Sequence, residues 1–146
     1  MSNGTVTAPT VSKASGTSSW TVNIDGNGTT GTTLTSNATI TYSCSGWYTE
    51  NDDWRCDNKG SYTPTSSETL YAKWDATTGN YGSVNLPSNL TRTGYTLLGF
   101  STSSTAALAQ YSPGATYTPT SNGTTLYAVW EPNIYTMTIE PNGGEL

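Results

Sequence analysis

Apolar and polar residues alternate along several short segments of the chain, as expected for strands with one buried face. Residues 20–25 alternate in this way and stop at a Gly-Asn-Gly turn sequence, residues 38–42 alternate again, and residues 135–140 repeat the pattern of residues 20–25. Residues 69–74 are expected to form a further strand. The Ala-rich residues 106–109 are the one place where a turn or two of helix is expected. The pattern predicts a mostly β chain with at most one short helix.

A motif near the end of one predicted strand occurs twice. Tyr-Thr-Pro-Thr-Ser begins at Tyr62 and again at Tyr117, and each copy leads into Thr-Leu-Tyr-Ala-x-Trp, which ends at Trp74 and at Trp130. The two tryptophans lie 56 residues apart (130 minus 74) and the two starting tyrosines 55 (117 minus 62). Matching aromatic positions at a fixed spacing predict two copies of one small β module.

A second motif, Tyr-x-x-x-Gly-aromatic-x-Thr, precedes each copy and begins at Tyr42 and at Tyr95. Modules of this size bury a small core, so support from a neighbour, a disulfide or a subunit contact is expected. The predicted organisation is a linker or leading strand at 1–19, a first module at 20–74, a second module at 75–130, and a further strand at 131–146.

The carboxy-terminal residues 135–144 repeat the pattern of residues 20–28, whereas the second module has no leading strand of its own in sequence. A sheet that lacks a strand exposes unpaired backbone groups, and a spare strand can supply them to a neighbour. The predicted assembly strand carries Tyr135, Met137 and Ile139. Two alternatives remain open: this strand folds back on its own second module, or it begins a third repeat.

Gly-Tyr-Thr-x-x-Gly-Phe-x-Thr at 94–102, Leu-Tyr-Ala-x-Trp at 70–74 and 126–130, and residues 135–144 together resemble the internalin B repeat, also called the Listeria-Bacteroides repeat. The resemblance implies β-grasp-like modules strung in tandem in secreted or wall-attached bacterial surface proteins. It also implies spacers and binders, not enzymes. The first copy departs from the family pattern because it lacks the Tyr-Gly-x-x-x-x-Leu-Pro segment seen at 81–87.

Composition narrows the function classes. Thr and Ser make up about a third of the 146 residues, 10% are charged, the net charge is -5, and histidine is absent. Scattered basic residues leave no cationic stripe for nucleic acid, and no apolar run reaches the length of a membrane span. Without histidine, the commonest general base and metal ligand is missing. No cofactor is expected.

Three features favour an extracellular location. Cys44 and Cys56 are the only cysteines, and we expect them to form a disulfide. The surface is acidic and rich in hydroxyl groups. Possible N-glycosylation sites, which a Thr-rich sequence also generates by chance, occur at Asn3, Asn27, Asn37, Asn89 and Asn122.

The loop at 47–57 carries the candidate ligand chemistry. A weak calcium hypothesis uses its clustered carboxylates, although a solvated loop explains the same residues. Trp47, Tyr48 and Trp54 are candidate sugar-stacking rings, and partly buried packing is the competing interpretation. The four carboxylates are Glu50, Asp52, Asp53 and Asp57.

The sequence therefore predicts a non-catalytic extracellular structural or adhesive protein. The spare strand at 135–140 predicts self-association head to tail into a filament by strand exchange. The alternative is a module that binds a cell-surface glycan or protein receptor through the aromatic acidic loop.

Overall fold

The computed structural model describes residues 4–146, which form strands, turns and extended segments with no helix. The predicted mostly β fold is confirmed, whereas the short helix considered at 106–109 is absent. The loop around it is held at its ends, because the Thr102 N–H donates to Oε1 of Gln110 at 2.9 Å and the Gln110 N–H donates to the Phe100 carbonyl at 2.9 Å. Four residues inside such a loop are too few to nucleate a helix.

The strands vary in length from two residues to seventeen. In chain order they are β1 (Val6–Thr7), β2 (Gly16–Asp25), β3 (Thr32–Tyr48), β4 (Trp54–Cys56), β5 (Ser61–Tyr62), β6 (Tyr71–Thr78), β7 (Val84–Asn85), β8 (Tyr95–Ser101), β9 (Thr116–Tyr117) and β10 (Thr124–Pro132).

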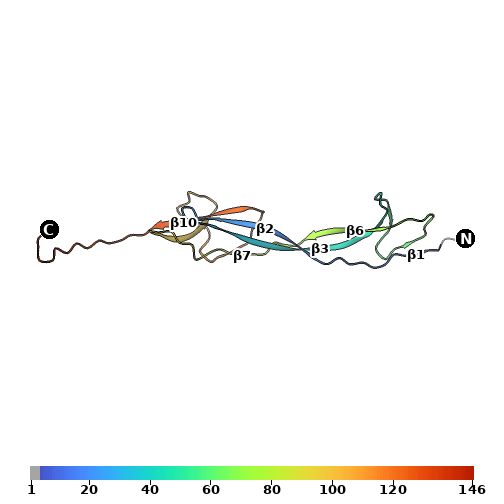
Figure 1. The fold of residues 1–146 in the computed structure, drawn as a ribbon, viewed down its shortest axis with the longest axis horizontal. Coiled ribbons are helices and arrows are strands. Elements are labelled where there is room, and N and C mark those ends of the chain that lie inside the picture. The colour runs from blue at the N-terminus through green and yellow to red at the C-terminus, as the bar shows by residue number, and fades with distance from the viewer. Residues whose placement is uncertain (1–3) are drawn as a thin grey trace. The chain divides into compact units, whose positions relative to one another are not determined.

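The chain divides into two compact units, each built from two separate stretches of sequence (Figure 1). Unit 1 contains residues 4–19 and 37–82, and unit 2 contains residues 20–36 and 83–146. Strands β2 and β3 contribute residues to both units. These boundaries differ from the consecutive modules expected at 20–74 and 75–130, because the hairpin at 20–36 pairs with distant strands instead of with the segment that follows it.

Unit 2 has its leading strand, contrary to the expectation that one was missing. Strand β2 runs parallel to β10, with Val22 opposite Thr124 and Ile24 opposite Leu126. In Figure 1 the blue β2 and the orange β10 lie side by side although a hundred residues separate them. Strand β10 also pairs antiparallel with β8. The leading strand of unit 2 thus comes from residues 20–25, which precede residues 37–82 of unit 1 in the sequence.

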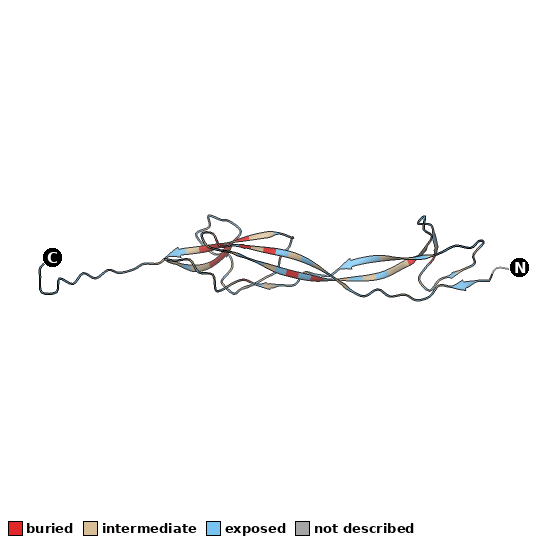
Figure 2. Ribbon diagram, in the orientation of Figure 1, coloured by how far each residue is buried: buried red, intermediate tan, exposed pale blue. Residues whose placement is uncertain are grey.

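The core of unit 2 gathers the apolar faces of these strands. Val22, Phe100 and Leu126 are fully buried, and Figure 2 shows buried positions along β2, β8 and β10. The alternation at 20–25 therefore places one side of β2 in a closed core. The buried cluster consists of Val22, Ile24, Leu86, Phe100, Leu126 and Ala128.

Unit 1 has a much smaller core. Strand β3 pairs antiparallel with β6 along Ile40 to Tyr48 and with β4 at Trp47 and Tyr48. Among the buried apolar residues of the described chain, unit 1 contributes only Ala38 and Cys56. Its sheet is formed, but few apolar side chains are buried against it.

A two-stranded ladder of the same register occurs in both units. In unit 1, β1 pairs antiparallel with β5, and Val6 lies opposite Tyr62. In unit 2, β7 pairs antiparallel with β9, and Val84 lies opposite Tyr117. The two units therefore share this ladder, although Ala8 stands in unit 1 where unit 2 has Leu86.

A glycine before the central aromatic residue is also shared. Gly46 has φ 141° and precedes Trp47, and Gly99 has φ 144° and precedes Phe100. The pairing of β3 with β6 shifts register at Gly46, and that of β8 with β10 shifts opposite Gly99. Such a bulge needs a residue that tolerates positive φ, which explains the repeated glycine.

Candidate functional site

The carboxy-terminal segment, residues 133–146, contains five of the nine large apolar side chains that are exposed in the described part of the chain. Strand β10 ends at Pro132, and no strand pairing involves the residues beyond it. Ile134 is 96% exposed, Met137 83% and Tyr135 75%, and Ile139 is also exposed. Alternating apolar side chains in contact with water, next to unpaired backbone groups, make this segment suited to pairing with another sheet.

The turn that follows this segment already has the geometry of the turn after β2. Asn142 has φ 52°, and its N–H donates to Oε1 of Glu140 at 3.3 Å. Asn27 has φ 49°, and its N–H donates to Oδ1 of Asp25 at 2.8 Å. The glycine after each asparagine also has a positive φ. The likeness between residues 135–144 and 20–28 therefore extends from sequence to backbone conformation.

Unit 1 contains an apolar groove of about 270 Å³. A cavity of about 150 Å³ with such a lining accepts a benzene molecule, so this groove has room for two aliphatic side chains. It was missed by sequence reasoning. The signal that could have found it is Val6-Thr7-Ala8-Pro9, which matches the Val-x-Leu-Pro of residues 84–87. The main lining residues are Val6, Ala8, Trp47, Cys56, Tyr62 and Leu70.

The aromatic residues proposed as ligand contacts are not equally accessible. Trp47 is half-buried at the groove, and its indole Nε1 is buried with no hydrogen-bond partner in the described residues. Tyr48 is half-buried beneath the ammonium of Lys73, 4.7 Å from its ring centre. Trp54 is 53% exposed. Of the three rings, Trp54 is the one that presents a face to solvent.

The carboxylates of the same loop do not form a metal site. Asp52 makes an ion pair with Lys73 at 2.7 Å, and Asp52 is itself well exposed. Within residues 4–146, no group of three or more His, Cys, Asp or Glu side chains could hold a metal ion. Glu50, Asp53 and Asp57, together with Asp52, are exposed loop residues.

The expected disulfide is not formed, because Cys44 and Cys56 are both free thiols. Cys44 lies opposite Trp74 in the pairing of β3 with β6, whereas Cys56 lies opposite Trp47 in the pairing of β3 with β4. Three residues along a strand correspond to roughly 10 Å, beyond the Cα separation that a disulfide spans. Burial raises the pKa of Cys56, so this thiol is an apolar lining group of the groove.

A charged network that the sequence did not reveal borders the groove. Arg55 donates from Nε to Oε1 of Glu68 at 2.9 Å and from Nη2 to Oε2 at 3.3 Å, and the Tyr62 hydroxyl donates to Glu68. The hydrogen bond from Arg55 and then that from Tyr62 lower the pKa of Glu68. The network fixes the loop before β6.

The five possible N-glycosylation sites differ in their surroundings. Asn3 lies outside the described residues. The Asn27 amide donates to the carbonyls of Ser104 at 2.9 Å and Ala128 at 3.0 Å, so it has a structural role in unit 2. Asn37, Asn89 and Asn122 are exposed. Glycosylation stays a prediction at these positions.

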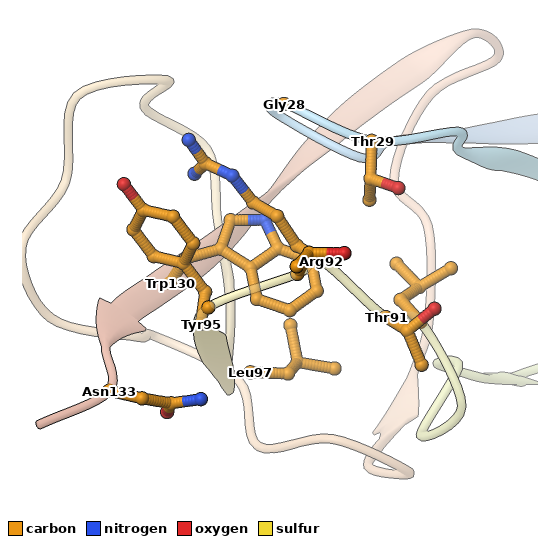
Figure 3. A pocket seen from close by; sticks show the side chains of 11 residues that line it. Gly28, Thr29, Thr91, Arg92, Tyr95, Leu97, Trp130 and Asn133 are labelled. Atoms are coloured by element: carbon orange, nitrogen blue, oxygen red, sulfur yellow. The ribbon is translucent and has the colours of Figure 1, made fainter. Parts of the chain in front are cut away.

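Unit 2 has an open, mostly polar hollow of about 810 Å³ near the end of β10 (Figure 3). The Arg92 guanidinium lies over the ring of Tyr95 at 3.8 Å from its centre, and Figure 3 shows Trp130 close by. The Trp130 indole N–H donates to the Gly26 carbonyl at 2.7 Å, which attaches β10 to the turn after β2. The polar groups that line the hollow therefore bond to other residues of unit 2.

The arrangement defines a small β-repeat module with an exposed strand-like segment at one end of its sequence. Residues 75–129 match the family model of the Listeria-Bacteroides repeat domain. The family recognised from its motifs is thus confirmed. No helix among residues 4–146 has the length and apolarity of a membrane span.

One curated relative comes from Evansella cellulosilytica and carries the provisional name of a Gly-rich membrane protein. It is 40% identical over 63 residues, which cover 42% of this chain and 7% of that protein. The chain therefore matches a small part of the relative's length. No solved structure gives a significant match.

Proposed function

We propose that this chain is a non-catalytic extracellular structural protein whose copies associate head to tail through their carboxy-terminal segments. The observation that carries the proposal is the exposure of Ile134, Tyr135, Met137 and Ile139 on one extended segment. Burying these side chains against another sheet releases water from them. The free energy gained is roughly 25 cal/mol per Å² of apolar surface buried. The match of residues 75–129 to a surface-associated repeat family supports the same class of function.

Association by an extended strand also explains why the segment is so regular. An added strand gains affinity from backbone hydrogen bonds and specificity from alternate side chains that enter pockets. Because the donor and the acceptor are different surfaces of one chain, the contact is heterologous and can continue without limit. The expected product is a linear polymer.

Deletion of residues 134–146 tests this function. The truncated chain should stay monomeric in light scattering and show no filaments by electron microscopy at concentrations where the full chain assembles. The double variant Thr136→Ser, Thr138→Ser is the matched control, since it keeps the apolar positions, and it should assemble. Equal assembly of the full and truncated chains would refute the proposed function.

A second candidate is recognition of a cell-surface glycan or receptor by the loop at 47–57. The exposure of Trp54 beside Asp52 and Asp53 favours it, because an exposed ring can stack on a sugar face. On a glycan array, Trp54→Ala should lose any binding that the unaltered chain shows. Binding that survives this substitution excludes Trp54 as the contact.

A further inference from the structure

Unit 1 lacks a strand that unit 2 has. By the Leu-Tyr-Ala-x-Trp motif, Tyr71 corresponds to Tyr127, so residues 68–70 correspond to the first three residues of β10. In unit 2 these three residues are in the strand, and they pair with β2. In unit 1, β6 begins only at Tyr71, the first position that pairs with β3. The edge of β6 that corresponds to the β2 side of β10 has no partner strand in the described residues.

The groove of unit 1 occupies the place of the missing side chains. Its Leu70 corresponds to Leu126, and its Trp47 follows the same glycine as Phe100. Leu126 and Phe100 are fully buried because Val22 and Ile24 of β2 pack with them in one cluster. Leu70 and Trp47 remain half-exposed. Unit 1 therefore has residues that correspond to the core of unit 2, but no strand that corresponds to β2 covers them.

The carboxy-terminal segment has the sequence of the strand that fills this core in unit 2. Trp-Thr-Val-Asn-Ile-Asp at 20–25 aligns with Tyr-Thr-Met-Thr-Ile-Glu at 135–140, and both are followed by a turn with Asn-Gly. Met137 and Ile139 stand at the positions of the buried Val22 and Ile24. Both apolar side chains are exposed where they are now.

We propose that residues 135–140 of a second copy of this chain insert into the groove of unit 1, parallel to the start of β6, as the strand that unit 1 lacks. By the register of β2 with β10, Ile139 lies opposite Leu70 and Glu140 opposite Tyr71. Met137 and Ile139 then fill the groove, and residues 68–70 become part of the strand. The inference rests on the proposed function and specifies its acceptor site.

A second copy is favoured because of where the chain enters and leaves unit 2. The connections to unit 1 follow Ser19, Ser36 and Gly82 in sequence, and the first two lie at the open end of the β2–β3 hairpin. Strand β10 runs parallel to β2 and therefore leaves at the turn end, where Trp130 bonds to Gly26. Only two residues separate the end of β10 from Tyr135, so the segment begins at the turn end of the hairpin and not at Ser19 or Ser36, where the chain passes into unit 1.

Two complementary variants give a directional test. The chain lacking residues 134–146 retains the groove and cannot donate, whereas Leu70→Glu keeps the donor segment and places a carboxylate in the groove. Each alone should be monomeric in light scattering, and a mixture should form one-to-one complexes that do not grow. Leu70→Met, which preserves apolar volume, is the control and should assemble like the unaltered chain.

A peptide of residues 133–146 tests the groove without altering it. Added in excess to the full chain, the peptide should stop elongation. It should also bind the truncated chain, and Ile139→Asp in the peptide should weaken that binding at least about 100-fold. Binding should shift the Trp47 emission, and the shift should disappear in Trp47→Phe. This measurement remains decisive if Leu70→Glu does not fold.

The outcomes separate the acceptor assignment from the proposed function. If deletion of 134–146 abolishes assembly but Leu70→Glu assembles normally and the peptide leaves Trp47 unchanged, the segment docks elsewhere and the groove assignment is wrong. If the full chain stays monomeric at all concentrations and its groove does not bind added peptide, the segment occupies the groove of its own chain. The proposal that a second copy supplies the strand would then be wrong.

Discussion

At the scale of the residue, Gly99 shows how closely the backbones of unit 2 approach one another. A Cβ at this position would lie 2.0 Å from the carbonyl oxygen of Tyr111, and φ is 144°. The Phe100 N–H donates to that same carbonyl at 2.8 Å. The glycine therefore permits both the bulge and the contact that brings Phe100 into the core.

We expect Gly99→Ala to lower the free energy of unfolding of unit 2 by about 3 kcal/mol, since strain at φ and a backbone clash add. Gly94→Ala is the matched control, because Gly94 also has positive φ, 82°, but nothing lies within 4 Å of an added Cβ. It should cost about 1 kcal/mol. Denaturant unfolding monitored by fluorescence measures both, and equal losses would contradict the close approach.

At the scale of the element, one sequence pattern occurs in two environments. Residues 20–25 form the second part of β2, where Val22 and Ile24 are buried in unit 2, while residues 135–140 are exposed and unpaired. Local alternation predicted that both segments favour strands, because it depends on side chains only. It could not predict the partners, because the pairing of β2 with β10 joins residues about a hundred positions apart.

The same limit explains why the expected disulfide was wrong. Trp74 and Trp130 end two copies of one motif, whereas each compact unit combines two separate stretches of sequence, which depends on long-range pairing. Cys44 and Cys56 are close in sequence, but their strand neighbours place them apart. The likeness of Tyr135, Met137 and Ile139 to the β2 pattern was visible in the sequence, and their pairing with another chain stays a prediction. The groove had only the match of residues 6–9 to 84–87 as a signal, and its volume follows from the fold.

The contrast between the two segments gives a direct prediction. Ile24→Ala should destabilise the unassembled chain by about 2–5 kcal/mol, because it leaves a cavity beside Leu126 in a closed core. Ile139→Ala, the same change on the exposed copy, should leave that stability unchanged within about 0.5 kcal/mol. Thermal unfolding of both variants, each made in the Leu70→Glu chain so that it does not assemble, tests this. A large loss for Ile139→Ala would show that the segment packs within its own chain.

At the scale of the whole molecule, the two units bury unequal amounts of apolar surface. Unit 2 contributes seven of the nine buried apolar residues, and unit 1 contributes Ala38 and Cys56. Because burial is the main favourable contribution to folding, the units should differ in stability. Unit 1 also contains the ion pair of Arg55 with Glu68 before β6.

We expect two thermal transitions, with unit 1 unfolding at the lower temperature. The pKa of Glu68 is lowered below its usual 4.5, so its stabilisation is present above that value and is lost as the pH falls through the folded pKa. Acidification should therefore shift the first transition downward more than the second. Calorimetry from pH 7 to pH 3 checks this, and Glu68→Gln should reduce the difference. A single transition that shifts uniformly would contradict it.

The pairing of β2 with β10 also has a consequence for the time course of folding. Val22 and Thr124 are neighbours across 102 intervening peptide bonds (124 minus 22), so the chain must close a long loop before this ladder forms. In a chain that is synthesised or exported amino end first, β2 can pair with β3 early, but its other partner is missing until residues 124–127 of β10 emerge. One edge of β2 is thus among the first segments made and among the last to be paired, so the core of unit 2 cannot close until most of the chain has been produced.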